Sequence, residues 1–78
     1  MPEPAYPALA RAAHASGVVI VQVIVDDDGK IMAAQVLRGH PLLQAAALKA
    51  AREMQFIPTR LNNQAVKVIG VINYNFVL

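Results

Sequence analysis

The clearest pattern along the chain is an alternation of hydrophobic residues between Val18 and Asp26. Every second position on one face holds a valine: Val19, Val21, Val23 and Val25. β-branched residues repeating with a period of two predict a β-strand whose valine face is buried. The positions between the valines are also mostly apolar, which predicts a central strand or a second covered face.

A second strand is expected after a tight turn. The turn comprises Asp27, Asp28 and Gly29, and Gly29 is expected to have a positive φ. The strand extends from Lys30 to Arg38, but its alternation is imperfect. A β-bulge near Ala33 would return the apolar side chains to one face. These side chains are Ile31, Ala34 and Val36.

Two segments have the pattern of helices. From His40 to Met54 the chain is rich in alanine, which has high helix propensity, and apolar residues recur at helical spacing. The inward-facing residues are Leu43, Ala47, Ala50 and Met54. His40 is expected in the cap region, and Pro58 prevents the helix from continuing. A shorter helix is predicted from Ala8 to Ala15, ended by Gly17.

The last apolar segment predicts a third strand from Ala65 to Val77, after a turn at Asn62 and Asn63. Gly70, in the middle of this strand, is expected to mark a bulge or the close approach of another backbone. The residues predicted to share one face are Val66, Val68, Ile72, Tyr74 and Phe76.

These elements predict an α+β fold with the order α-β-β-α-β. The expected architecture is a two-layer domain, in which a three-stranded antiparallel sheet has two helices on its valine face. The third strand is expected to pair beside the first, which makes the first strand central. The third strand then has one long free edge.

The amino-acid composition indicates that part of the apolar surface contacts a partner. A chain of 78 residues forms at most one domain, and 56% of these residues are hydrophobic while only 15% are charged. A domain this small cannot bury so much apolar surface, so part of it should lie on a strand face or edge that meets a partner. Residues 1–5 are expected to be the end of a proline-containing linker, and residues 6–78 the domain.

Several function classes are disfavoured. The net charge is only +2, the basic residues are scattered, and two tyrosines and two phenylalanines are too few for base-stacking platforms, so no nucleic-acid partner is expected. Ser16 and Thr59 have no histidine and carboxylate placed nearby by the sequence, so we expect no enzyme activity.

No metal site or cofactor is expected either. Asp26 to Asp28 resemble the start of a calcium loop, but the position of the closing glutamate is occupied by Leu37. His14 and His40 lie on different elements, and the chain has no cysteine. The acidic run is therefore interpreted as a solvated turn.

Together these residues resemble the C-terminal domain of the TonB family of energy transducers. The resemblance covers nearly the whole chain and depends on the order and spacing of several motifs. The motifs are Tyr6-Pro7; the G-x-V-x-V-x-V run of Gly17, Val19, Val21 and Val23; Asp26, Gly29 and Ile31; Val36-Leu37; His40-Pro41-Leu42-Leu43; Ala46-Ala47; and Phe56 with Pro58.

The resemblance implies a periplasmic domain carried behind an inner-membrane helix and a proline-rich spacer. Through that N-terminal part it would contact an inner-membrane motor of the ExbB/ExbD type. Family members couple the proton gradient to outer-membrane TonB-dependent transporters, as in siderophore and iron uptake. They bind the transporter's TonB box, a short N-terminal segment that adds as a strand beside the domain's last strand.

Carried over to this chain, the resemblance implies a partner-binding edge at Val66, Lys67, Val68, Ile69, Gly70, Val71, Ile72, Asn73 and Tyr74. Two features depart from the family pattern. Arg38-Gly39-His40 stands where many members have a serine-rich step, and the tail after Phe76 is very short. The first departure affects the loop contacts, and the second leaves the edge more open.

Two other interpretations stay open at this point. The edge and the outer sheet face could pair with a second copy of the chain to form a homodimer, which would bury the surplus apolar surface. Alternatively, a TonB-like domain could act as an envelope scaffold or sensor with a different periplasmic partner.

Overall fold

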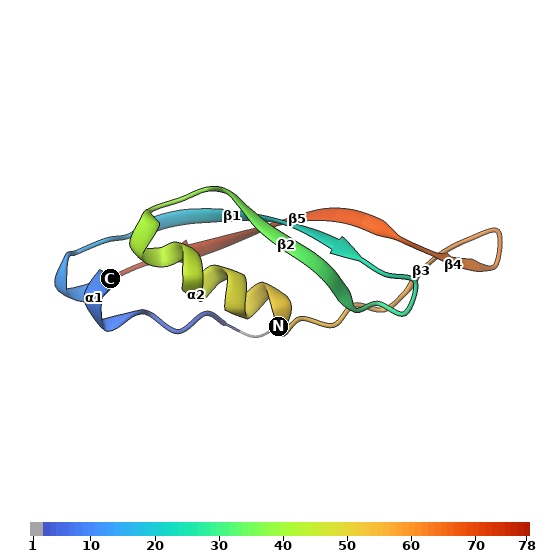
Figure 1. Cartoon of the computed structure of the whole chain (residues 1–78), viewed down its shortest axis with the longest axis horizontal. Helices are drawn as coiled ribbons and strands as arrows, with labels where there is room; N and C mark the ends of the chain where they lie inside the picture. Colours follow the sequence, from blue (N-terminus) through green and yellow to red (C-terminus); the bar gives the residue numbers. More distant parts are fainter. Residues whose placement is uncertain (1–2) are drawn as a thin grey trace.

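A computed structural model describes residues 3–78 and confirms the two-layer α+β arrangement. A three-stranded antiparallel sheet has the order β2-β1-β5, in which β1 is Gly17–Val25, β2 is Ile31–Arg38 and β5 is Val68–Phe76. Figure 1 shows the two helices, α1 (Ala8–Ala12) and α2 (Pro41–Arg52), below this sheet. A separate hairpin projects from one end of the molecule and comprises β3 (Thr59–Leu61) and β4 (Gln64–Val66).

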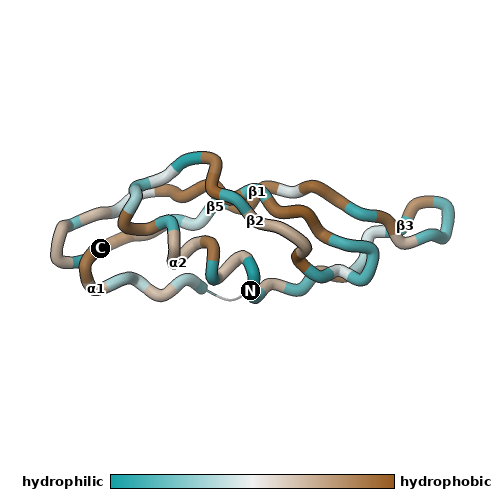
Figure 2. The backbone as a smooth tube through the Cα atoms, viewed as in Figure 1, coloured by the Kyte–Doolittle hydropathy of each residue, from teal (hydrophilic) through white to brown (hydrophobic). Residues whose placement is uncertain are grey.

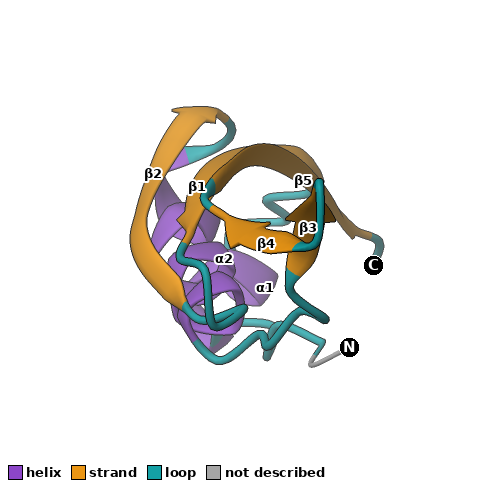
Figure 3. Ribbon diagram, turned by 90° about the vertical axis from the view of Figure 1, so that its right-hand side faces the viewer, coloured by secondary structure: helices purple, strands orange, loops and turns teal. Residues whose placement is uncertain are grey.

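The core lies between the valine face of β1 and helix α2. Figure 3 shows the sheet arching over both helices, and the valines Val19, Val21 and Val23 are almost fully buried under this arch. Leu43 of α2 is fully buried as well. Burying one such side chain stabilises the fold by about 1.5–3 kcal/mol relative to leaving it exposed. Figure 2 shows that the hydrophobic residues follow the strands along most of their length.

The predicted bulge in β2 is present. The pairing with β1 changes from Ile24 opposite Ala33 to Val25 opposite Ile31, so Met32 is the additional residue. The side chains that the bulge was expected to realign are half-buried against the core, whereas Met32 is exposed. These realigned residues are Ile31, Ala34 and Val36.

The turn between β1 and β2 is fixed by a backbone contact with a distant segment. Gly29 has a φ of +85°, as predicted, and its carbonyl accepts a 2.9 Å hydrogen bond from the Phe56 N–H. A Cβ atom on Gly29 would lie only 1.9 Å from the Phe56 carbonyl oxygen. Glycine is therefore required here by close approach as well as by its φ.

Helix α2 begins where the sequence predicts and ends slightly earlier. His40 is the N-cap, and its Nδ1 accepts a 3.1 Å hydrogen bond from the Leu42 N–H, so the cap-region prediction is confirmed. The helix ends at Arg52, while Met54 follows it in the core.

Helix α1 is shorter than the predicted range Ala8–Ala15, because it ends at Ala12. His14 has a φ of 56°, and the Ala15 N–H donates to the Ala10 carbonyl at 2.8 Å. This is the pattern of a Schellman C-cap, in which a left-handed residue reverses the chain after the last turn. The left-handed residue that ends the helix is therefore His14 and not Gly17.

The predicted strand from Ala65 to Val77 is divided in two. Its first residues belong to β4, which pairs with β3, and Lys67 separates β4 from β5. The turn at Asn62 and Asn63 is confirmed, and both residues have a positive φ that suits a two-residue hairpin. The bulge predicted as one alternative for Gly70 is absent, because the β1–β5 register passes through it without a shift. Within residues 3–78, a Cβ atom on Gly70 would lie near the Val23 side chain and near no backbone atom of another strand.

The molecule is elongated, with extents of 49 × 19 × 16 Å. Residues 3–5 have no regular structure, and the part of the linker prediction that concerns residues 1–2 lies outside the described residues. Tyr6 attaches this end to the domain: its hydroxyl donates to the Ala15 carbonyl, and its ring makes an edge-to-face contact with Phe76 at 5.5 Å.

Candidate functional site

The candidate site is the outer edge of β5. Strand β5 pairs with β1 along its whole length, from Val25 opposite Val68 to Gly17 opposite Phe76. Within residues 3–78, no strand pairs with the other side of β5. Its backbone groups on that side are therefore available to a further strand.

The turn after β1 indicates which β5 residues face the open edge. The Asp26 N–H donates to the Lys30 carbonyl at 2.8 Å, and the Asp26 carbonyl accepts from the Gly29 N–H at 3.0 Å, so both groups face β2. Backbone groups alternate sides along a strand, so those of Val25 and of every second residue before it face β5.

The register then assigns the β5 backbone groups. Gly70 and Ile72 of β5 lie opposite β1 residues whose backbone groups face β5. These two residues therefore direct their own N–H and C=O groups toward β1. The intervening residues direct theirs toward the open edge. These intervening residues are Ile69, Val71, Asn73 and Asn75.

The two faces of β5 differ in burial. Tyr74 and Phe76 are buried on the helix side, where Val68 and Ile72 also contact the core. On the outer face, Ile69 is 67% exposed and Val71 is 57% exposed. Among the described residues, the edge therefore combines backbone groups that pair with no strand and apolar side chains that are exposed.

The residues that the sequence predicted for partner binding are not all on one strand. Val66 lies in β4 opposite Thr59, and Lys67 lies between β4 and β5. The others, from Val68 to Tyr74, lie consecutively in β5. Asn75 has edge-facing backbone groups by the same register but was not included in the prediction.

The structure also places two residues beside the edge that the sequence did not assign to the site. Phe56 is half-buried, and Ile57 is 92% exposed. Both line a small pocket of about 140 Å³ together with Val68, Gly70 and Val71. The available sequence signal was the F-x-P exit after α2, which shows that the helix ends but not where the chain then goes.

Tyr74 shows how the inner side of the edge strand is fixed. Its hydroxyl donates to the Met54 Sδ at 3.3 Å. Burial disfavours the charged phenolate and so raises the pKa of Tyr74 above its ordinary value of 10.0. Tyr74 is therefore a structural residue on its buried side, while its strand neighbours are exposed.

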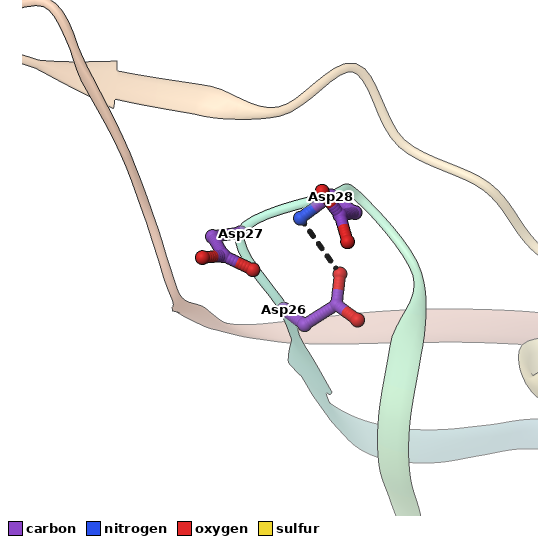
Figure 4. Close-up of side chains that lie close together, drawn as sticks. All are labelled: Asp26, Asp27 and Asp28. Carbon is purple, nitrogen blue, oxygen red and sulfur yellow. Dashed lines mark hydrogen bonds between the residues drawn. The ribbon is translucent and has the colours of Figure 1, made fainter.

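Figure 4 shows the three acidic residues of the first turn. Their carboxylates lie within 4.8 Å of one another, and those of Asp27 and Asp28 are exposed. One Asp26 carboxylate oxygen accepts hydrogen bonds of 2.9 Å from the backbone N–H groups of Asp28 and Lys30. Asparagine and aspartate commonly stabilise turns in this way, so the geometry supports a structural role in the hairpin.

No helix in the described range 3–78 combines the length and the apolar character that crossing a membrane requires. Comparison with protein families gives one finding. Residues 2–78 match the family described as the Gram-negative bacterial TonB protein C-terminal. No curated protein matches the chain.

Proposed function

The chain belongs to the family of Gram-negative bacterial TonB protein C-terminal domains, which are periplasmic, non-enzymatic transport domains, and from this membership we propose a specific binding role. The domain binds the N-terminal TonB box of an outer-membrane transporter by adding it as a strand beside β5. The bound segment then couples the transporter to energy supplied through the inner membrane.

One observation supports strand addition most directly. The edge residues Ile69, Val71 and Asn73 are opposite β1 positions whose backbone groups face β2, so their own N–H and C=O groups face away from the sheet. An extended peptide can satisfy these groups with backbone hydrogen bonds, which supply affinity without requiring a particular sequence.

We propose that an inner-membrane anchor and an ExbB/ExbD-type motor act on the domain through its N-terminal side. The transported cargo, including any iron-siderophore complex, is then selected by the transporter. The domain itself carries out no chemical step.

An amide-resolved NMR titration tests strand addition. The probe is a short extended peptide from the N-terminus of a candidate transporter, and the expected shifts concentrate in the segment from Val66 to Tyr74. The matched control is the same peptide with proline at alternate positions, which removes N–H donors and should weaken binding. Shifts spread evenly over the domain, or equal binding of both peptides, would contradict strand addition.

A further inference from the structure

We infer that the β5 edge contains a subsite for one aliphatic side chain, located beside Gly70, and that this subsite selects among the segments that bind. The inference rests on the proposed function, because it concerns the side-chain preference of the added strand. The partner it specifies is an extended segment with a valine-sized or leucine-sized residue at the position next to Gly70.

The subsite is the pocket of about 140 Å³ that opens next to β5. Its walls are mostly apolar, since they include Val23 and Val25 of β1, Val68 of β5, and Phe56 and Ile57 of the preceding loop; Thr59 is the polar side chain among the lining residues. A cavity of about 150 Å³ lined by aliphatic and aromatic side chains can bind benzene. The volume of this pocket therefore matches a branched aliphatic group, and its mostly apolar lining disfavours a charged one.

The pocket exists because β5 has no side chain at Gly70. The inner face of β5 is otherwise occupied by Val68 and Ile72, which flank this position. A Cβ atom on Gly70 would lie 3.7 Å from the Val23 Cγ2, which is an ordinary van der Waals contact. A side chain at this position could thus fill the space without straining the sheet, and in its absence the space is open to a ligand.

The opposite wall is held in place by the first turn. Phe56 is fixed by its N–H bond to the Gly29 carbonyl, and the close approach of these two backbones leaves no room for a side chain on residue 29. Ile57 follows directly, at 92% exposure on the rim of the pocket. A large aliphatic residue this exposed would lose contact with water when a ligand occupies the subsite.

The orientation of the edge identifies the occupant as a strand. Ile69 and Val71 direct their backbone groups outward on either side of Gly70, so an added strand would be bonded at both positions. Residues directly beside each other on paired strands project their side chains to the same face of the sheet. The added residue next to Gly70 therefore projects toward the helix side, where the pocket lies.

Two designed peptides measure the preference. Both are extended serine-threonine sequences of equal length, and one has a single central valine where the other has serine. We expect the valine peptide to bind the domain about tenfold more tightly, which is at the low end for burial of one such side chain. Because the peptide has only one valine, the binding of that side chain in the subsite sets the register of the peptide on β5. NMR chemical shift changes should then appear at Val23 and Phe56.

Two variants test whether the pocket causes the preference. Gly70→Val fills the space and should reduce the ratio of the two affinities to nearly one. Ile57→Ser changes only an exposed rim residue and should reduce the ratio partially, which keeps the test decisive if Gly70→Val fails to fold. Ile69→Ser is the matched control on the outer face and should leave the ratio unchanged.

The outcomes separate the subsite from strand addition. If both peptides bind wild-type protein at β5 with equal affinity, the subsite is refuted and strand addition stands. If neither peptide nor any transporter segment perturbs β5, strand addition itself fails. A preference for valine that persists in Gly70→Val and in Ile57→Ser would place the selectivity elsewhere on the edge.

Discussion

Tyr74 joins the edge strand to the segment that follows helix α2 through a single side chain. Its ring is buried on the inner face of β5, and its hydroxyl contacts the Met54 Sδ. The same strand exposes Val71 on its other face. Burial raises the pKa of Tyr74, so the folded state retains the phenolic proton at pH values where the unfolded chain has lost it.

The stability of the domain should therefore fall at alkaline pH, in part because Tyr74 ionises there. The contribution of Tyr74 to the free energy of unfolding is fully present below about pH 10. It is lost as the pH rises through the pKa of Tyr74 in the folded state, because the unfolded state binds fewer protons than the folded state in this range. Tyr74→Phe should lower the free energy of unfolding at pH 7 by about 1 kcal/mol or less, since it removes one weak hydrogen bond. The same substitution should also make the free energy of unfolding fall less steeply with pH above about pH 10.

Urea unfolding of both proteins between pH 7 and pH 11 measures this effect. The expected result is that the two curves of unfolding free energy against pH converge as pH rises. Parallel curves would show that Tyr74 does not contribute to the alkaline decline.

At the level of elements, β5 has two sets of backbone groups with different roles. One set completes the sheet with β1, and the other faces the open edge. Adjacent residues belong to opposite sets. A substitution at one position therefore affects binding at the open edge, and the same substitution at the next position affects pairing with β1. This property allows binding and stability to be separated experimentally.

Val71→Pro and Ile72→Pro form the corresponding pair of variants. Val71→Pro removes an edge-facing N–H and should leave the domain folded, because proline is tolerated on edge strands. Peptide affinity should fall about twofold to tenfold, as expected for one hydrogen bond. Ile72→Pro removes a donor to β1 and should destabilise the domain by more than about 1 kcal/mol.

Circular dichroism and peptide titration of both variants provide the measurement. A folded Val71→Pro domain with wild-type affinity would refute the assignment of the edge-facing groups. Equal destabilisation by the two substitutions would show that the β5 N–H groups do not alternate as the register indicates.

The long elements were predictable because their patterns are long. The valines of β1 and the alanine-rich α2 each repeat over several turns or pleats, and the free edge of β5 follows from pairing the third strand with the first. Strands β3 and β4 have three residues each, which is too short for a period to be visible. The Phe56–Gly29 contact joins segments that are distant along the chain, and so no local pattern indicates it.

The whole molecule presents a covered face and an uncovered one. Both helices lie on the valine side of the sheet, while large apolar residues are exposed on the strands, including Met32, Leu37, Ile69 and Val71. A second copy could pair with β5 or pack on this outer face. The two arrangements differ in whether the edge stays available to a peptide.

We expect peptide binding and self-association to compete. The β5 edge has a single row of donors and acceptors, so a copy paired there excludes an added strand. Sedimentation velocity over a range of protein concentrations, with and without saturating peptide, measures this. Any dimer should dissociate as peptide is added. A dimer that binds peptide with unchanged affinity would show that association uses the outer face.

The pairing of β1 with β5 has a consequence for the order of events during folding. Gly17 pairs with Phe76, so the central strand cannot acquire its second neighbour until nearly all of these residues are free to fold. Until then the valine-rich β1 has only β2 beside it and an exposed hydrophobic edge. Pairing between distant segments requires closure of a long loop, which slows folding. The interval before β5 arrives is therefore when this chain is most prone to aggregation, and when a chaperone would have most effect.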